Sequence, residues 1–219
     1  MITNYKELTI NKYLEIREIL EEDGGELNIQ ARIIGCLTDM DLDTVLNLSL
    51  TKYNELAQGT AFLMEKPKID GRFPQKLNIN GKECYLTTNV NKLTAGQYID
   101  YQSYIAMPDQ EKYLANILAC FIVPKGKTYG DGYDTDEIAQ WLGENLSVKD
   151  AMNICFFFRK KYLCSIKRML TFLESQMTIA RWRTKDPKMK EKMKEINRRM
   201  EEYRQLLESV GDGSTWLTK

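Results

Sequence analysis

Apolar residues recur every three or four positions along most of the chain, which is the spacing of one face of an α-helix. In the first 65 residues this pattern predicts four helices, each with a polar residue or turn at its start. The predicted starts are Thr9, Asn28, either Asp41 or Asp43, and Ser49. Most of the chain is therefore expected to be helical.

The apolar period changes from three or four to two near residue 65. Residues 76–79 and 82–86 alternate apolar and polar side chains on either side of Asn80-Gly81, the strongest short hairpin signal. A lone hairpin is marginally stable in water, so this one must pack on helices or pair with a further strand. Residues 60–70 are the candidate for that third strand.

Helical spacing resumes at Thr94, where Thr94 and Gln97 have the spacing of a capping box. Residues 110–123 are then apolar on most sides, which predicts one central core helix ended by Pro124.

Two long helices are predicted in the last third of the chain. Ser147 and Asp150 form a second capping box at the start of the first, and Asp186-Pro187 begins the second. The last helix has apolar residues at alternating spacings of four and three, typical of a coiled-coil seam. These positions are Met189, Met193, Ile196, Met200, Tyr203, Leu207 and Val210.

The predicted fold class is therefore mainly α with a small β-hairpin or three-stranded sheet, an α+β protein that ends in a long helical hairpin. We expect a helical globular domain at 1–146 with the hairpin insert near 65–88. A coiled-coil-like helical hairpin follows at 147–210, and a flexible tail at 211–219.

Composition removes several classes of function. The chain has no histidine, which excludes His-based triads and His metal ligands. The five cysteines form no C-x-x-C pair and lie in apolar surroundings, which predicts buried reduced thiols in a cytosolic protein. No apolar run reaches about 18 residues and the N-terminus lacks a signal-peptide layout, so neither a membrane nor secretion is indicated.

The charges are segregated along the chain. Residues 1–66 carry 6 basic and 12 acidic residues, a net charge of −6, whereas residues 147–219 carry 17 and 9, a net charge of +8. This asymmetry favours packing within the chain or head-to-tail contact between copies. Solvated faces that differ in charge fit the same numbers.

The segment 124–137 has the appearance of a binding loop. Gly126-Lys127-Thr128 matches the end of a phosphate loop, but the first glycine of that motif would fall at Phe121, and a helix is predicted before it. A calcium loop fails because Ile138 stands where an oxygen ligand is needed. We expect a connector in which Asp134 caps the next helix.

Two C-terminal features suggest partners. Residues 181–204 carry 10 basic and 5 acidic side chains, so nucleic acid is an alternative partner, although the charges also flank the predicted seam. Trp216 and Leu217 follow a glycine-containing linker and are interpreted as either a docking segment or a frayed terminus.

The hairpin is followed by a distinctive helix start. The hairpin matches the pattern G-K-x-Y, and the helix start matches L-T-x-x-x-Y/W-I-D; both are interpreted as capping and core positions. Tyr85 is one place late in the first pattern, because Cys84 holds the usual position. The pattern resembles that of tail assembly chaperones of tailed bacteriophages. The matching residues are Gly81, Lys82, Tyr85, Leu93, Thr94, Tyr98, Ile99 and Asp100. The upstream helical segment is also similar, through Leu37, Thr38, Leu48, Tyr53, Leu56, Phe62 and Leu63, so the resemblance covers residues 30–125.

The resemblance implies a non-enzymatic phage assembly protein that binds the tape-measure protein or tail-tube subunits through apolar helix faces. Alternatives are a virion component, such as a head–tail connector or tail-ring protein that oligomerises, or a nucleic-acid-associated protein. The resemblance also implies that the protein lies in the host cytoplasm or is incorporated into the virion. No catalytic residue, cofactor, metal or small-molecule substrate is predicted. The expected partner-binding residues are Met189, Met193, Ile196, Met200, Tyr203, Leu207, Trp216 and Leu217.

Overall fold

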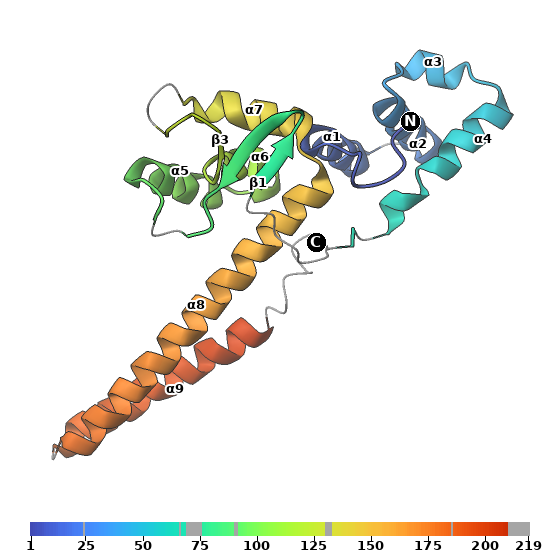
Figure 1. Cartoon of the computed structure of the whole chain (residues 1–219). Helices are drawn as coiled ribbons and strands as arrows, with labels where there is room; N and C mark the ends of the chain where they lie inside the picture. The colour runs from blue at the N-terminus through green and yellow to red at the C-terminus, as the bar shows by residue number, and fades with distance from the viewer. Residues whose placement is uncertain are drawn as a thin grey trace. The chain divides into compact units, whose positions relative to one another are not determined.

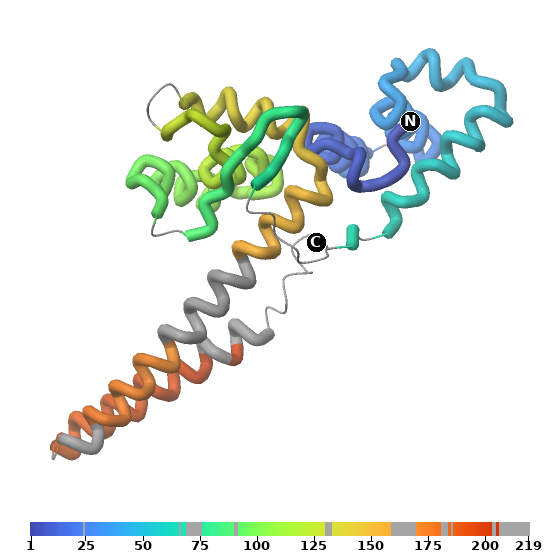
Figure 2. Tube along the Cα trace, viewed as in Figure 1, coloured from blue at the N-terminus to red at the C-terminus, as the bar shows by residue number. Residues whose placement is uncertain are grey.

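The structure is a computed structural model of the 219-residue chain (Figure 1). It describes residues 1–23, 25–65, 67–68, 76–89, 92–129, 133–184 and 186–209 (Figure 2), with the backbone alone at 159–169, 181–183, 203–204 and 206–209. The chain divides into two compact units, Met1–Ile154 and Cys155–Lys219. The predicted fold class is confirmed: the chain is mainly α, with a small three-stranded antiparallel sheet and long C-terminal helices.

The first unit begins with four helices, three of which start directly after the predicted residues, although the Thr9 side chain makes no capping hydrogen bond. They are α1 (Ile10–Glu21), α2 (Glu26–Thr38), α3 (Leu42–Leu46) and α4 (Leu50–Gly59). The side chains of Asp41 and Ser49 accept hydrogen bonds from the backbone N–H groups of Thr44 and Lys52, which confirms both caps. The second helix begins two residues before the predicted Asn28. Helices α2, α3 and α4 share a core of Ala31, Ile34, Val45 and Leu56.

The predicted hairpin is confirmed. Strands β1 (Lys76–Ile79) and β2 (Lys82–Leu86) pair antiparallel, and β3 (Ile122–Pro124) pairs with the other edge of β2. At the turn, Asn80 and Gly81 both have positive φ angles, 46° and 78°. This is the combination that a two-residue type I′ turn requires, and Asn-Gly adopts it at low cost.

The prediction for the third strand was wrong. Within 60–70, residues Ala61–Met64 form a short 3₁₀ helix. The predicted single helix at 110–123 instead divides into a 3₁₀ turn (Gln110–Tyr113), helix α6 (Leu114–Ala119) and β3. Pairing explains the change: Ile122 lies opposite Leu86 and is fully buried, so a partner distant in sequence overrides the local helical spacing.

Two further helices of the first unit are α5 (Ala95–Ile105) and α7 (Thr135–Asn145). The Thr94–Gln97 capping box at the start of α5 is confirmed, and the Gln97 side chain also donates a hydrogen bond of 3.0 Å to the Cys120 carbonyl. Helix α6 packs against α7. The Tyr133 hydroxyl donates to the carbonyls of Ala119 and Ile122, which ties the start of α7 to α6 and β3.

The long helix α8 (Val148–Arg183) begins inside the first unit. Ser147 caps it through the Asp150 N–H, as predicted. Val148, Ala151 and Ile154 are at most 1% exposed, and the Val148 N–H donates to the Leu8 carbonyl at 2.7 Å. These first two turns therefore belong to the core of the N-terminal unit.

The second unit is a helical hairpin made of the rest of α8 and α9 (Pro187–Ser209), which lie side by side in Figure 1. The Asp186 carboxylate accepts a hydrogen bond of 2.9 Å from the Lys188 N–H, and Pro187 occupies the first helical position as predicted. Only three residues connect the helices, so the connection favours antiparallel neighbours.

Candidate protein-interaction surface

The packed face of the hairpin can be located from two buried residues. Leu170 and Met200 are each 8% exposed and lie 13 residues from Arg183, where α8 ends, and from Pro187, where α9 begins, which places them at the same level. Met193 and Asn197 on α9 are half-buried. The face of α9 that packs on α8 is therefore Met193, Asn197 and Met200.

This face differs from the predicted seam. Met193 and Met200 lie on it, whereas Met189 and Ile196 are 45% and 46% exposed. Within this hairpin Asn197, and not Ile196, lies on the packed face, so the predicted partner-binding role of Ile196 stays a prediction. The side chains of Tyr203 and Leu207, and residues Trp216 and Leu217, lie outside the described part of the chain, so their predicted role stays a prediction.

An exposed apolar strip, which we call the apolar side and define as Leu173, Met189 and Ile196, flanks the packed face. Each residue of a helix is turned by about 100° from the one before. Met189 and Ile196 are thus turned by about 40° and 60° from Met193, and Leu173 by about 60° from Leu170, all in the same sense. In antiparallel helices this brings the three side chains to one side of the hairpin. Their exposed fractions are 41%, 45% and 46%.

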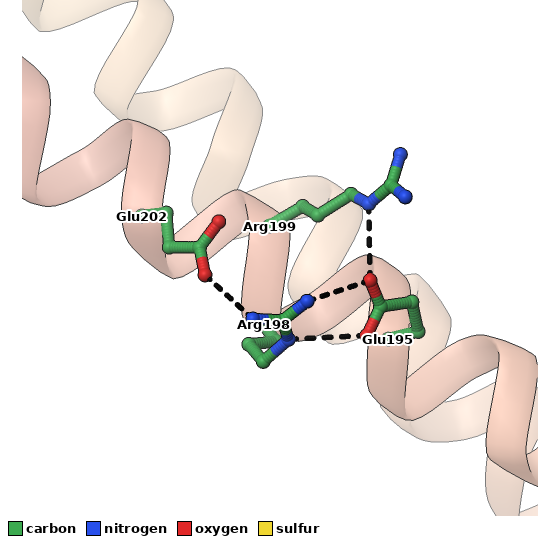
Figure 3. Close-up of polar contacts among 4 residues, drawn as sticks. All are labelled: Glu195, Arg198, Arg199 and Glu202. Atoms are coloured by element: carbon green, nitrogen blue, oxygen red, sulfur yellow. Dashed lines mark hydrogen bonds and ion pairs between the residues drawn. The ribbon is translucent and has the colours of Figure 1, made fainter.

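The outer face of α9 carries a cluster of ion pairs (Figure 3). Arg198 contacts Glu195 at 2.8 Å and Glu202 at 3.0 Å, and Arg199 contacts the same Glu195 at 3.1 Å. Hydrogen bonds from Arg198 and then Arg199 lower the pKa of the Glu195 carboxyl to about 2. Since Glu195 is turned by about 160° from Met193, in the same sense as Ile196 but about 100° further, this cluster faces away from α8.

The end of the hairpin is strongly basic. Residues 181–194, which we call the basic tip, contain seven basic and two acidic residues. Lys194 pairs with Glu191 at 3.2 Å. The structure gives no ion pair to Lys188 or Lys192 among the residues it describes. Both lysines are exposed and lie next to the apolar side.

Two recesses in the first unit are candidate ligand sites. One, of about 220 Å³, lies between α1 and α2 and includes Glu15, Arg32 and Cys36. The Cys36 thiol donates to Glu15 at 3.3 Å, and burial together with this carboxylate raises its pKa to about 12, so it is a weak nucleophile. The Arg32 guanidinium is bound by both oxygens of Glu22.

The other recess is wide and open, about 640 Å³, with carboxylates and tyrosines on its walls. Its groups already serve the fold: Asp134 caps α7 through the N–H groups of Asp136 and Glu137, and Tyr104 donates to Asp136 at 3.2 Å. Burial raises the pKa of Tyr104, so its hydroxyl stays protonated at neutral pH. Among the described residues, no group of three His, Cys, Asp or Glu side chains is placed to hold a metal ion.

The loop after β3 is a connector in its described part. The expectation of a helix before Gly126 was wrong, because β3 precedes it. A phosphate cradle is nevertheless not formed, since the Lys127 N–H donates to the Pro124 carbonyl at 3.1 Å and the next helix starts only at Thr135. The predicted Asp134 cap is confirmed.

The residues of the phage-like pattern are only partly core. Thr94 caps α5, but Tyr85, Tyr98 and Ile99 are 41%, 46% and 61% exposed. Their assignment to the core was wrong, because β2 and α5 turn these side chains outward.

Comparisons with models of known protein families, with curated proteins and with solved structures find no match to this chain. The relation to phage tail proteins therefore stays a prediction from the residues of the pattern. Over the residues that the structure describes, no helix is both long and apolar enough to cross a membrane.

Proposed function

We propose that this chain is a non-enzymatic assembly protein that binds the apolar face of a partner helix along the apolar side of its C-terminal hairpin. The observation that carries the proposal is the exposure of Leu173, Met189 and Ile196 on one side of two packed helices. Methionine adapts to partners of different shape. An amphipathic helix laid along such a strip is a common mode of peptide recognition.

The size of the apolar side points to transient binding. Complete burial of a Leu, Met or Ile side chain contributes about 1.5–3 kcal/mol, and these three are already more than half buried. Covering the rest contributes about 1 kcal/mol each. A Kd of 1 µM corresponds to about 8 kcal/mol. A partner held for long must therefore contact further surface, whereas a helper that releases its partner at assembly needs little more.

The biological setting in this proposal is phage tail assembly, with a tape-measure or tail-tube protein as the partner. Support for that setting comes from the resemblance over residues 30–125 alone. The exposed Tyr98 and Ile99 of the pattern offer a second contact on α5. A permanent virion component that oligomerises through the same hairpin is the alternative, and the identity of the bound protein separates the two.

The test is photo-crosslinking at one position on each side of the hairpin. A photoreactive phenylalanine analogue at Ile196 lies on the apolar side, and the same residue at Thr178 lies about 140° around α8 from Leu173 and is also exposed. In the cells that naturally produce the protein, position 196 is expected to yield a crosslinked protein identified by mass spectrometry, and position 178 none. Absence of any crosslinked protein at 196, or equal yields at both positions, contradicts the proposal.

A further inference from the structure

A second exposed apolar surface lies on the first unit. It consists of Leu27, Leu46 and Leu50, exposed by 75%, 59% and 75%, and we call it the leucine face. The Tyr53 hydroxyl lies 3.5 Å from the Leu27 carbonyl oxygen and so brings α2 next to α4. Leu50 is three residues before Tyr53, on the same side of α4, and Leu46 ends the neighbouring α3.

The leucine face is bordered by negative charge. Glu26 precedes Leu27, and Asp43 lies one turn before Leu46 on α3; both carboxylates are exposed. Neither has an ion pair among the residues that the structure describes. Residues 1–66 as a whole carry a net charge of −6.

The C-terminal hairpin combines exposed apolar residues with positive charge, which complements the negative border of the leucine face. Met189 and Ile196 of its apolar side are bordered by Lys188 and Lys192. Lys188 lies in the first turn of α9, where the positive end of the helix dipole disfavours a cation. The helix dipole therefore does not favour Lys188 at this position, whereas contact with an acidic surface would favour it.

We propose that the leucine face of one copy is covered by the hairpin of a second copy, with Glu26 and Asp43 facing Lys188 and Lys192. This inference rests on the proposed function in its oligomerising form, because it makes a second copy, and not a tail protein, the occupant of the apolar side. The charges favour protein over nucleic acid: the chain is neutral overall, and its acidic first 66 residues would repel phosphate groups. Because the two surfaces differ, the contact is head-to-tail and generates rings or open filaments.

Reciprocal charge reversal tests the contact. The tip variant is Lys188→Glu/Lys192→Glu, and the face variant is Glu26→Lys/Asp43→Lys. The matched control, Lys190→Glu/Lys194→Glu, reverses two charges on the side of α9 away from Ile196. The readout is the mass by light scattering at about 0.05 and 0.5 M salt, up to about 1 mM protein, since charge contacts are screened by salt.

The wild type and the control are expected to self-associate at low salt and to dissociate at high salt. The tip and face variants alone should associate at least tenfold more weakly, and an equimolar mixture of the two should associate again. A chain carrying all four reversals should also recover. The neutral pair Glu26→Gln/Asp43→Asn repeats the face test without placing lysines at helix N-termini.

A wild type that is monomeric at both salt concentrations overturns the inference. Failure of the mixed tip and face variants to associate also overturns it, because a contact within one chain would give that result. Large species that nuclease removes overturn it in favour of nucleic acid. These failures are separate from failure of the proposed function: a crosslink from position 196 to a different protein retains that function without self-contact. No crosslink at all contradicts the function itself.

Discussion

At the scale of single residues, the backbone carbonyl of Met40 approaches Gly35 closely. A Cβ at this position would lie 2.8 Å from the carbonyl oxygen of Met40, an atom that cannot rotate away. The Met40 N–H in turn donates to the Gly35 carbonyl at 3.1 Å, where α2 ends with Asp39 at a φ of 58°. The absence of a side chain thus lets the chain fold back over the last turn of α2.

We predict that Gly35→Ala lowers the free energy of unfolding by about 1–3 kcal/mol, the usual cost of overpacking, although alanine is the better helix former by about 1 kcal/mol. Urea denaturation measures the change. Gly25→Ala is the control, because nothing lies within 4 Å of its added Cβ. Equal stability of the Gly35→Ala protein and the wild type would show that the end of α2 relaxes freely.

The cysteines give a second prediction at this scale. Burial raises the pKa values of Cys36, Cys120 and Cys155 to about 12, so these thiols are protonated at neutral pH. In a Cys164→Ser variant, a thiol-reactive dye should label the native protein very slowly and the urea-unfolded protein rapidly. Fast labelling of the native variant would mean that the core opens far more readily than its packing indicates.

At the scale of elements, α9 is stabilised on two different faces. Its inner face buries Met200, while its outer face carries the ion pairs around Glu195. The outer pairs are solvent-exposed, and such pairs contribute little each but act together when several share one carboxylate. Their influence should therefore depend on pH and salt.

We predict that the Glu195 carboxyl titrates near pH 2 in the native protein, well below an unfolded glutamate near 4.3. A carboxyl with a lowered pKa favours the folded state at pH values above the unfolded pKa, and this contribution is lost as the pH falls through the folded pKa. The window is therefore about pH 4.3 to 2. NMR titration of labelled glutamate side chains measures it, and Arg198→Gln/Arg199→Gln should return the midpoint toward its ordinary value. An unchanged midpoint in that variant would exclude these arginines as the cause.

At the scale of the whole molecule, the boundary between the two compact units falls inside a helix and not in a loop. Val148, Ala151 and Ile154 are buried in the first unit, and the N–H groups of Val148 and Lys149 bond to the carbonyls of Leu8 and Tyr5. The first turns of α8 therefore complete a core that begins with the first residues of the chain.

A pair of truncations tests this arrangement. Residues 1–158 are expected to unfold cooperatively in urea and to give dispersed NMR spectra, whereas residues 1–146, which lack three nearly fully buried side chains, should lose most of their stability. Circular dichroism and NMR distinguish the outcomes. Equal stability of the two fragments would mean that α8 contributes nothing to the first unit.

The sequence by itself determined the local events of this fold. The caps at Asp41, Ser49 and Thr94 and the turn at Asn80-Gly81 depend on atoms within about four residues of one another, so a short stretch of chain is enough to specify them. The fold class could be predicted because these caps and turns separate several segments with helical spacing from the one segment whose apolar and polar residues alternate.

The tertiary structure decided which segments pair and which faces are covered. Ile122 is a strand residue because it pairs with Leu86, 36 positions earlier, on the edge of β2 that β1 leaves free. For the candidate surface, the heptad spacing included the buried Met200 but could not show that Asn197, and not Ile196, would lie beside it on the packed face. Helical spacing fixes the angles between side chains, whereas the rotation of the helix against its neighbour depends on packing that both helices determine together.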